Sequence, residues 1–106
     1  MTHHTLKSTT ATVHWGYFDA GVSPVLTIEP GDRVTVETLS GAPDVMPKPG
    51  SGFALPPELP EIHAKVPRKL PGHVLTGPVA IKGAMPGDAL EVEIEAIECR
   101  QTWRYN

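Results

Sequence analysis

The sequence contains one cysteine, few aromatic residues and no long apolar run. Cys99 has no second thiol to pair with inside the chain, which excludes a disulfide scaffold and is typical of a reducing compartment. No apolar stretch approaches the ~18 residues that a transmembrane helix needs, and the amino-terminal residues lack a basic start followed by an apolar run. We therefore expect a cytoplasmic protein that does not enter or bind a membrane.

The chain also lacks an excess of positive charge. Nine Lys and Arg residues against 12 Asp and Glu residues leave a formal net charge of -3 over 106 residues. A protein that binds a phosphate backbone or an anionic lipid surface needs a basic patch, which this balance does not supply, so we expect no nucleic-acid partner. The length fits a single β-rich domain over residues 1–106.

Proline and glycine are abundant, with 12 and 10 residues. Each proline inside a helix costs about 3 kcal/mol and removes a hydrogen-bond donor, so prolines this frequent leave no long helical run. An apolar content of 40% is too high for a disordered chain. The composition predicts an all-β fold, a β-sandwich or barrel-like unit with a long Pro-rich loop.

Alternating residues predict a strand over 89–96. Leu90, Val92 and Ile94 would face a core, while Glu91, Glu93 and Glu95 would face solvent or a polar interface. The same alternation is weaker over residues 33–37. At Ile97 the phase shifts, which places Cys99 among apolar positions and predicts a buried thiol.

The tripeptide Pro-Gly-Asp precedes both alternating stretches, at residues 30–32 and 86–88. Proline favours the second position of a type II turn, and glycine accepts the positive φ of the third position. We expect these turns to connect incoming strands at 25–28 and 79–81 with the outgoing strands that follow.

The loop over residues 43–71 holds 8 prolines, and apolar residues along it predict that it packs on the rest of the fold. One helical turn fits near Pro60, with this proline at the first helical position. In an extended segment Glu61 and His63 would point the same way, which suits an acid-base pair or a metal site. His73 could join His63 as a ligand of a divalent metal ion; the alternative is that both are surface loop histidines.

His14 lies in an aromatic stretch with Trp15, Tyr17 and Phe18. These aromatic side chains could line a small pocket, or the stretch could be a strand entering a core. His3 and His4 lie at the terminus, where order is least expected.

Several blocks of the sequence resemble, in the same order, the acetamidase/formamidase family. The resemblance covers nearly the whole chain. Its blocks are His3 to Lys7, Val13 to Ala20, Pro24 to Ile28 with Gly31 and Asp32, Glu58 to Arg68, Gly72 to Val79, and Pro86 to Val92.

The resemblance implies a β-rich, often oligomeric enzyme that hydrolyses short aliphatic amides, formamide or acetamide, to a carboxylate and ammonia. It also implies that this chain corresponds to the amino-terminal part of a longer enzyme, and that the rest of the enzyme or a companion chain completes it. We therefore expect the chain to be inactive alone, with His63 and Glu61 as catalytic candidates. The alternative is a non-catalytic β module that binds a partner or a small ligand.

Overall fold

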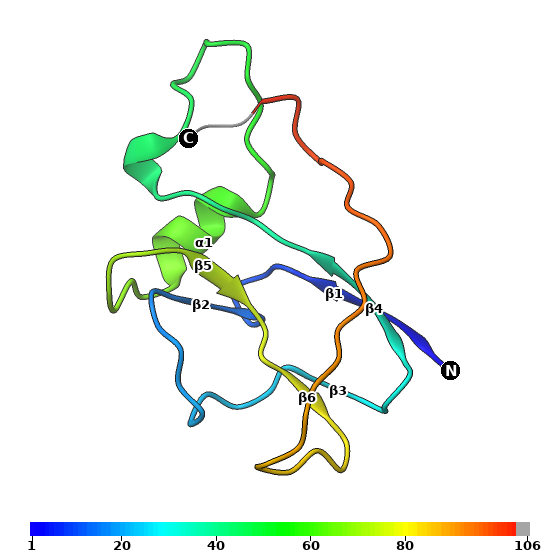
Figure 1. Ribbon diagram of the computed structural model, residues 1–106. Coiled ribbons are helices and arrows are strands. Elements are labelled where there is room, and N and C mark those ends of the chain that lie inside the picture. The colour runs from blue at the N-terminus through cyan, green and yellow to red at the C-terminus, as the bar shows by residue number, and fades with distance from the viewer. Residues whose placement is uncertain (104–106) are drawn as a thin grey trace.

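The computed structural model describes residues 1–103, and its strands form three pairs (Figure 1). One short helix and one 3-10 turn accompany the strands. The elements are β1 (His3–Lys7), β2 (Val13–Trp15), β3 (Leu26–Ile28), β4 (Arg33–Glu37), η1 (Pro43–Val45), α1 (Leu59–Lys65), β5 (Val74–Thr76) and β6 (Val79–Ile81).

Each sheet joins strands that are distant in the sequence. β1 pairs with β4 and β3 with β6, both in parallel, while β2 pairs with β5 in the antiparallel direction. The register sets Leu6 opposite Val36 and Lys7 opposite Glu37 in the first pair. The predicted all-β class is confirmed, whereas closure into a sandwich or barrel stays a prediction.

Both Pro-Gly-Asp turns form as the sequence predicts. Gly31 and Gly87 take φ values of 88° and 96°. The backbone N–H of Asp32 donates to the Glu29 carbonyl at 3.1 Å, and that of Asp88 donates to the Met85 carbonyl at 3.0 Å. Neither turn makes a hairpin, because β3 and β6 pair with each other and not with the chain that follows them.

The prediction of a strand over residues 89–96 is wrong. These residues form no sheet, and the chain crosses the molecule as an open trace past β4 (Figure 1). Leu90, Val92 and Ile94 are 68%, 73% and 73% exposed, although we expected them in a core. A strand requires a second strand for its backbone groups, and residues 1–103 supply none here.

Two further predictions at the ends of the chain also fail. Cys99 is exposed and not buried, because the segment before it does not pack. His3 and His4 are ordered in β1, where pairing with β4 holds the amino terminus in place. The His4 Nε2 atom lies 2.9 Å from a carboxylate oxygen of Asp32.

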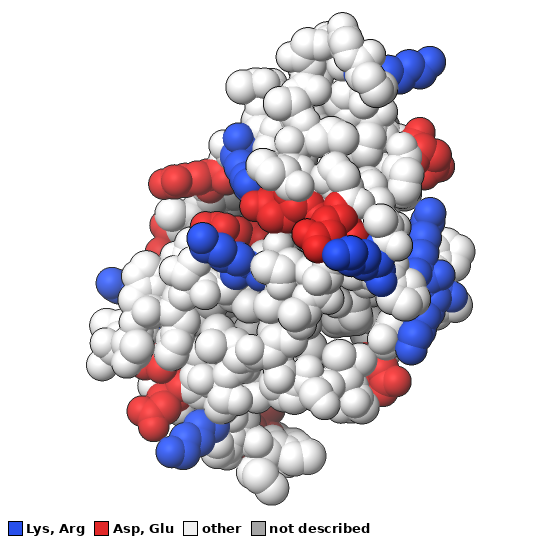
Figure 2. Space-filling model, turned by 180° about the vertical axis from the view of Figure 1, so that it is seen from behind, with Lys and Arg blue, Asp and Glu red and all other residues white. Residues whose placement is uncertain are grey.

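Positive and negative side chains alternate over the face seen in Figure 2, with no broad area of one sign. Arg33 and Glu95 form one exposed ion pair at 3.1 Å, and Arg100 and Glu58 form another at 2.9 Å. None of the helices within residues 1–103 has the length and apolar character needed to cross a membrane.

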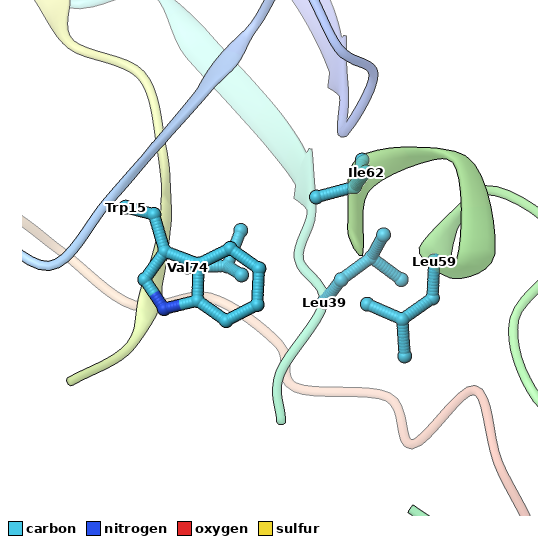
Figure 3. Close-up of a cluster of buried hydrophobic side chains, with 5 residues drawn as sticks. All are labelled: Trp15, Leu39, Leu59, Ile62 and Val74. Carbon is cyan, nitrogen blue, oxygen red and sulfur yellow. The ribbon is translucent and has the colours of Figure 1, made fainter. Parts of the chain in front are cut away.

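The largest buried cluster lies where α1 meets the β2–β5 pair (Figure 3). Leu59 and Ile62 of α1 are fully buried, and Trp15 of β2 is 2% exposed. Leu39 and Val74 complete the cluster from the chain after β4 and from β5. The loop over 43–71 is therefore anchored through its helix, as its apolar residues predicted.

The helix α1 is longer than the single turn expected, with seven residues. Pro60 lies in the first turn, where its missing N–H costs no helical hydrogen bond. Because Leu59 and Ile62 are three positions apart in the helix, both side chains lie on the face that packs on Trp15.

Candidate functional site

A small pocket of about 270 Å³ lies between β2 and the chain that leaves α1. The antiparallel pairing of β2 with β5 fixes one wall, and α1 fixes the start of the other. Its lining residues are Thr10, Val13, His14, Trp15, Tyr17, Lys65, Val66, Pro67 and Lys69.

Cationic side chains lie over the aromatic rings at this pocket. The Lys69 Nζ atom is 5.3 Å from the centre of the Tyr17 ring, and the Arg68 Cζ atom is 5.4 Å from that of Trp15. These are cation-π distances. Lys65 also lines the pocket, but its ammonium group is 3.0 Å from a carboxylate oxygen of Glu61. The balance of charge favours a ligand that presents oxygen atoms with partial or full negative charge.

His14 contributes an unused hydrogen-bonding atom. Its Nδ1 atom is buried and has no hydrogen-bond partner within residues 1–103. The ring lies 5.2 Å from that of Tyr17, measured between centroids. A buried polar atom without a hydrogen-bond partner is uncommon in native proteins. We therefore expect the His14 Nδ1 atom to bind a ligand or a water molecule.

The structure brings two of the three aromatic candidates to the pocket. Trp15 supplies an inner wall while its Nε1 donates to the Gly72 carbonyl at 3.1 Å. Tyr17 is half-buried and lines the opening. Phe18 is 92% exposed and is not among the lining residues. The stretch is thus both a strand that enters a core, through Trp15, and one wall of a pocket.

His63 lines a different hollow, although its ring lies near that of Trp15. The His63 and Trp15 ring centroids are 5.6 Å apart, and the second hollow has a volume of about 520 Å³. Its lining residues are Pro43, Met46, Pro47, Lys48, Pro49, Gly50, Phe53, Leu55, Pro60 and His63. His63 Nε2 lies 2.8 Å from the Gly41 carbonyl oxygen.

The contact with Gly41 fixes which nitrogen of His63 is free. A carbonyl oxygen accepts only, so Nε2 must carry the proton, and in the neutral ring Nδ1 then holds the lone pair. Any proton that His63 accepts therefore goes to Nδ1. His63 is not among the residues that line the first pocket.

Glu61 and His63 do not point the same way, because the segment is helical and not extended as we expected. Two residues apart in a helix are separated by about 200° around its axis. Glu61 is exposed and pairs with Lys65 one turn later, while His63 faces Gly41. The catalytic roles of both residues stay predictions.

The predicted metal ligands His63 and His73 belong to α1 and to the turn before β5. His73 is exposed in the turn before β5, where its carbonyl accepts a hydrogen bond from the Gly16 N–H at 3.1 Å. Within residues 1–103 no group of three or more His, Cys, Asp or Glu side chains is placed to hold a metal ion. The role of His63 and His73 as metal ligands stays a prediction, and we derive no step through a metal ion.

Shifted pKa values occur away from both hollows. The backbone N–H of Thr2 lowers the pKa of Asp32 to about 2, with smaller contributions from His4 and from the Glu29 N–H. Arg100 lowers the pKa of Glu58 by its hydrogen bond, and Glu58 in turn raises the pKa of Arg100. These shifts report structural contacts, since none of these residues lines either hollow.

Sequence reasoning missed Lys65 and Lys69 as pocket residues. The available signal was a short basic cluster interrupted by Pro67, which ends the helix and directs the chain past β2. A cluster of this length usually lies on a solvated surface, so only the contact with Tyr17 makes it informative.

The sequence profile of the Acetamidase/Formamidase family matches residues 3–106. The chain belongs to this family. Searches of curated proteins and of solved structures gave no significant match. This match confirms the resemblance seen in the sequence blocks. The matched residues include those of the pocket and of both Pro-Gly-Asp turns.

Proposed function

We propose that this chain is part of an amidohydrolase that converts short aliphatic amides, formamide or acetamide, to the carboxylate and ammonia. The observation that carries the proposal is the family match over residues 3–106. The single cysteine supports a cytoplasmic location for this reaction. The homo-oligomeric assembly expected from the sequence is part of the same proposal.

The pocket beside Tyr17 supports an amide ligand. A volume of about 270 Å³ holds a molecule of a few heavy atoms, and Trp15 supplies an apolar wall for a methyl group. Lys69 supplies N–H donors that would stabilise negative charge developing on the carbonyl oxygen. The same ammonium group would hold the carboxylate product.

Amide hydrolysis requires three converging roles: polarisation of the carbonyl, an activated water or nucleophile, and a proton for the leaving ammonia. The pocket offers the first through Lys69. His63 is the acid-base candidate, with Glu61 two positions before it in the sequence, but its side chain lines the second hollow and not this pocket. We therefore propose that the rest of the enzyme or a companion chain supplies the remaining groups and that residues 1–106 alone are inactive.

Amide binding tests the site without requiring turnover. Titration of the isotope-labelled chain with acetamide should shift the resonances of Tyr17 and Lys69 saturably in the millimolar range. Tyr17→Ala should abolish the response. Phe18→Ala is the matched control, because its ring is exposed one residue away, and it should leave the response unchanged. Shifts that never saturate, or that persist in Tyr17→Ala, would refute this pocket.

Ammonia release tests the second half of the proposal. The purified chain, incubated with formamide or acetamide, should release no ammonia above the uncatalysed background. A site that lacks one preorganised group typically loses a factor of 10² to 10³ or more in rate. Release by the chain alone that disappears in His63→Ala would show that these residues hold a complete amidase site.

The second candidate function is a non-catalytic β module that binds a partner. One observation favours it, namely the exposed apolar side chains over residues 89–97. An amide titration without effect, together with tight binding of a protein partner, would favour this alternative.

A further inference from the structure

The chain over residues 89–97, which we name the open segment, has the sequence of a strand without a strand's hydrogen bonds. Its residues make no backbone-to-backbone hydrogen bond with any part of residues 1–103. Leu90, Val92, Ile94 and Ile97 are 68% to 82% exposed. Exposed apolar side chains beside free backbone donors and acceptors favour addition of another strand.

The turn that precedes the open segment matches the turn that precedes β4. Asp32 and Asp88 each accept a hydrogen bond at Oδ2 from the backbone N–H three residues earlier, at 3.0 Å from Glu29 and 2.9 Å from Met85. Together with the backbone hydrogen bond and the glycine φ already described, this makes the two turns equivalent. Arg33 to Glu37 of β4 therefore correspond to residues 89–93.

The first turn shows what the second one lacks. Asp32 Oδ1 accepts a hydrogen bond from the Thr2 N–H at 2.9 Å, and Thr2 directly precedes β1, the parallel partner of β4. Asp88 Oδ1 has no partner within residues 1–103. The equivalent arrangement would place a backbone N–H on Asp88 Oδ1 and a parallel strand beside residues 89–93.

The register of the existing pair defines the chemistry of the missing strand. In β1, Leu6 lies opposite Val36 and Lys7 lies opposite Glu37. The corresponding positions in the open segment are Val92 and Glu93. An incoming strand that follows this register presents an apolar residue to Val92 and a basic residue to Glu93.

The row of glutamates favours a basic strand over a second copy of the open segment as the partner. Glu91, Glu93 and Glu95 are exposed, and within residues 1–103 only Glu95 has a cationic partner, Arg33 at 3.1 Å. Pairing two copies of the open segment would set one acidic row beside the other, which is destabilising. A strand with alternating Lys or Arg removes this repulsion.

We propose that the open segment is a docking site for a parallel β-strand from another polypeptide, one in which apolar residues alternate with Lys or Arg. The strand begins beside Asp88, whose free Oδ1 atom accepts the N–H of the residue before it, and continues past Glu93. Its apolar residues cover Leu90, Val92 and Ile94.

A synthetic peptide, Thr-Lys-Val-Lys-Val-Lys-Thr, serves as the probe, and the same peptide with Glu in place of Lys is its control. At millimolar concentration the Lys peptide should slow hydrogen exchange at least tenfold at alternate amides between residues 89 and 95. The Glu peptide should have no effect. No protection by the Lys peptide, or equal protection by both peptides, would overturn the proposal.

Charge reversal tests the recognition without changing a buried residue. The double variant Glu91→Lys and Glu93→Lys should invert the preference, so that the Glu peptide now protects and the Lys peptide does not. Unchanged exchange in β1 and β4 shows that the variant is folded. A double variant that still prefers the Lys peptide would contradict recognition by the acidic row.

A spin label on the amino end of the Lys peptide tests the direction. A parallel strand broadens resonances near residue 89, whereas an antiparallel strand broadens those near residue 95 and refutes the register. Sedimentation of the chain alone tests self-pairing. A dimer whose formation protects the open segment from exchange would also overturn the proposal.

Discussion

The carboxylate of Asp32 accepts the backbone N–H of Thr2 at 2.9 Å, across thirty residues of sequence. The same side chain closes its own turn and contacts His4. One aspartate therefore ties the Pro-Gly-Asp turn to the start of β1, and with it the parallel β1–β4 pair.

Asp32→Asn should reduce the acid sensitivity of folding. The folded pKa is about 2, below the value of 3.8 for the free side chain, so the charged form is favoured in the folded state. This contribution is complete above the unfolded pKa and is lost as the pH falls through the folded pKa. The stability difference between wild type and Asp32→Asn should therefore be constant at neutral pH and shrink from about pH 4 to pH 2.

Urea unfolding at pH 7, 4 and 2 measures this difference. Asp88→Asn is the matched control, because Asp88 closes an equivalent turn but makes no contact with β1. A difference for Asp32→Asn that stays constant down to pH 2 would contradict the role given to its carboxylate.

Gly16→Ala should destabilise the fold more than Gly83→Ala does. Gly16 has a φ of 93°, and an added Cβ atom would lie 2.1 Å from the Leu70 carbonyl oxygen. The expected loss is more than about 2 kcal/mol, because backbone strain and a steric clash add. Gly83 also has a positive φ, but an added Cβ atom would meet no other atom within 4 Å. Gly83→Ala should therefore lower the unfolding free energy by only about 1 kcal/mol. Equal losses in the two variants, measured by thermal or urea unfolding, would refute the clash.

Leu59→Ala should lower the unfolding free energy by about 2 to 5 kcal/mol, as expected for a cavity in a packed cluster. Leu59 is fully buried against Trp15 and Ile62, whereas Leu70 is 54% exposed. Leu70→Ala should change the unfolding free energy by no more than about 0.5 kcal/mol. A small loss in Leu59→Ala would show that α1 does not anchor the loop.

The sequence predicted the features that depend on neighbouring residues. The Pro-Gly-Asp turns formed because proline and glycine determine φ within four residues. The helix near Pro60 formed where proline is tolerated, although its length depends on burial of Leu59 and Ile62.

Features that depend on distant residues were not predicted. Alternation over 89–96 indicates a strand only when a second strand is present, and no local pattern shows which one. The contact between His4 and Asp32 joins residues 28 positions apart, and no local pattern indicates that it orders the amino terminus. Glu61 and His63 were assigned to one face because an extended segment was assumed.

The last prediction concerns His63. Its Nε2 atom donates to the Gly41 carbonyl at 2.8 Å, so the neutral ring should be almost entirely the Nε2–H tautomer. Long-range nitrogen-proton correlation spectra at pH 8 distinguish the two tautomers by their ring nitrogen shifts. His73 is the internal control, because it is exposed and its side chain has no hydrogen bond within residues 1–103. Its shifts should be those of a mixture.

A dominant Nδ1–H tautomer at His63 would show that the Gly41 contact does not hold the ring, and it would leave Nε2 as the nitrogen able to accept a proton. The expected result assigns that role to Nδ1 instead. Substrate would then have to approach His63 from the side of Nδ1, away from Gly41. In the completed enzyme, turnover lost in both His63→Ala and His63→Gln would support acid-base chemistry, because Gln can hydrogen-bond but cannot take up a proton, whereas turnover kept in His63→Gln would indicate a structural role.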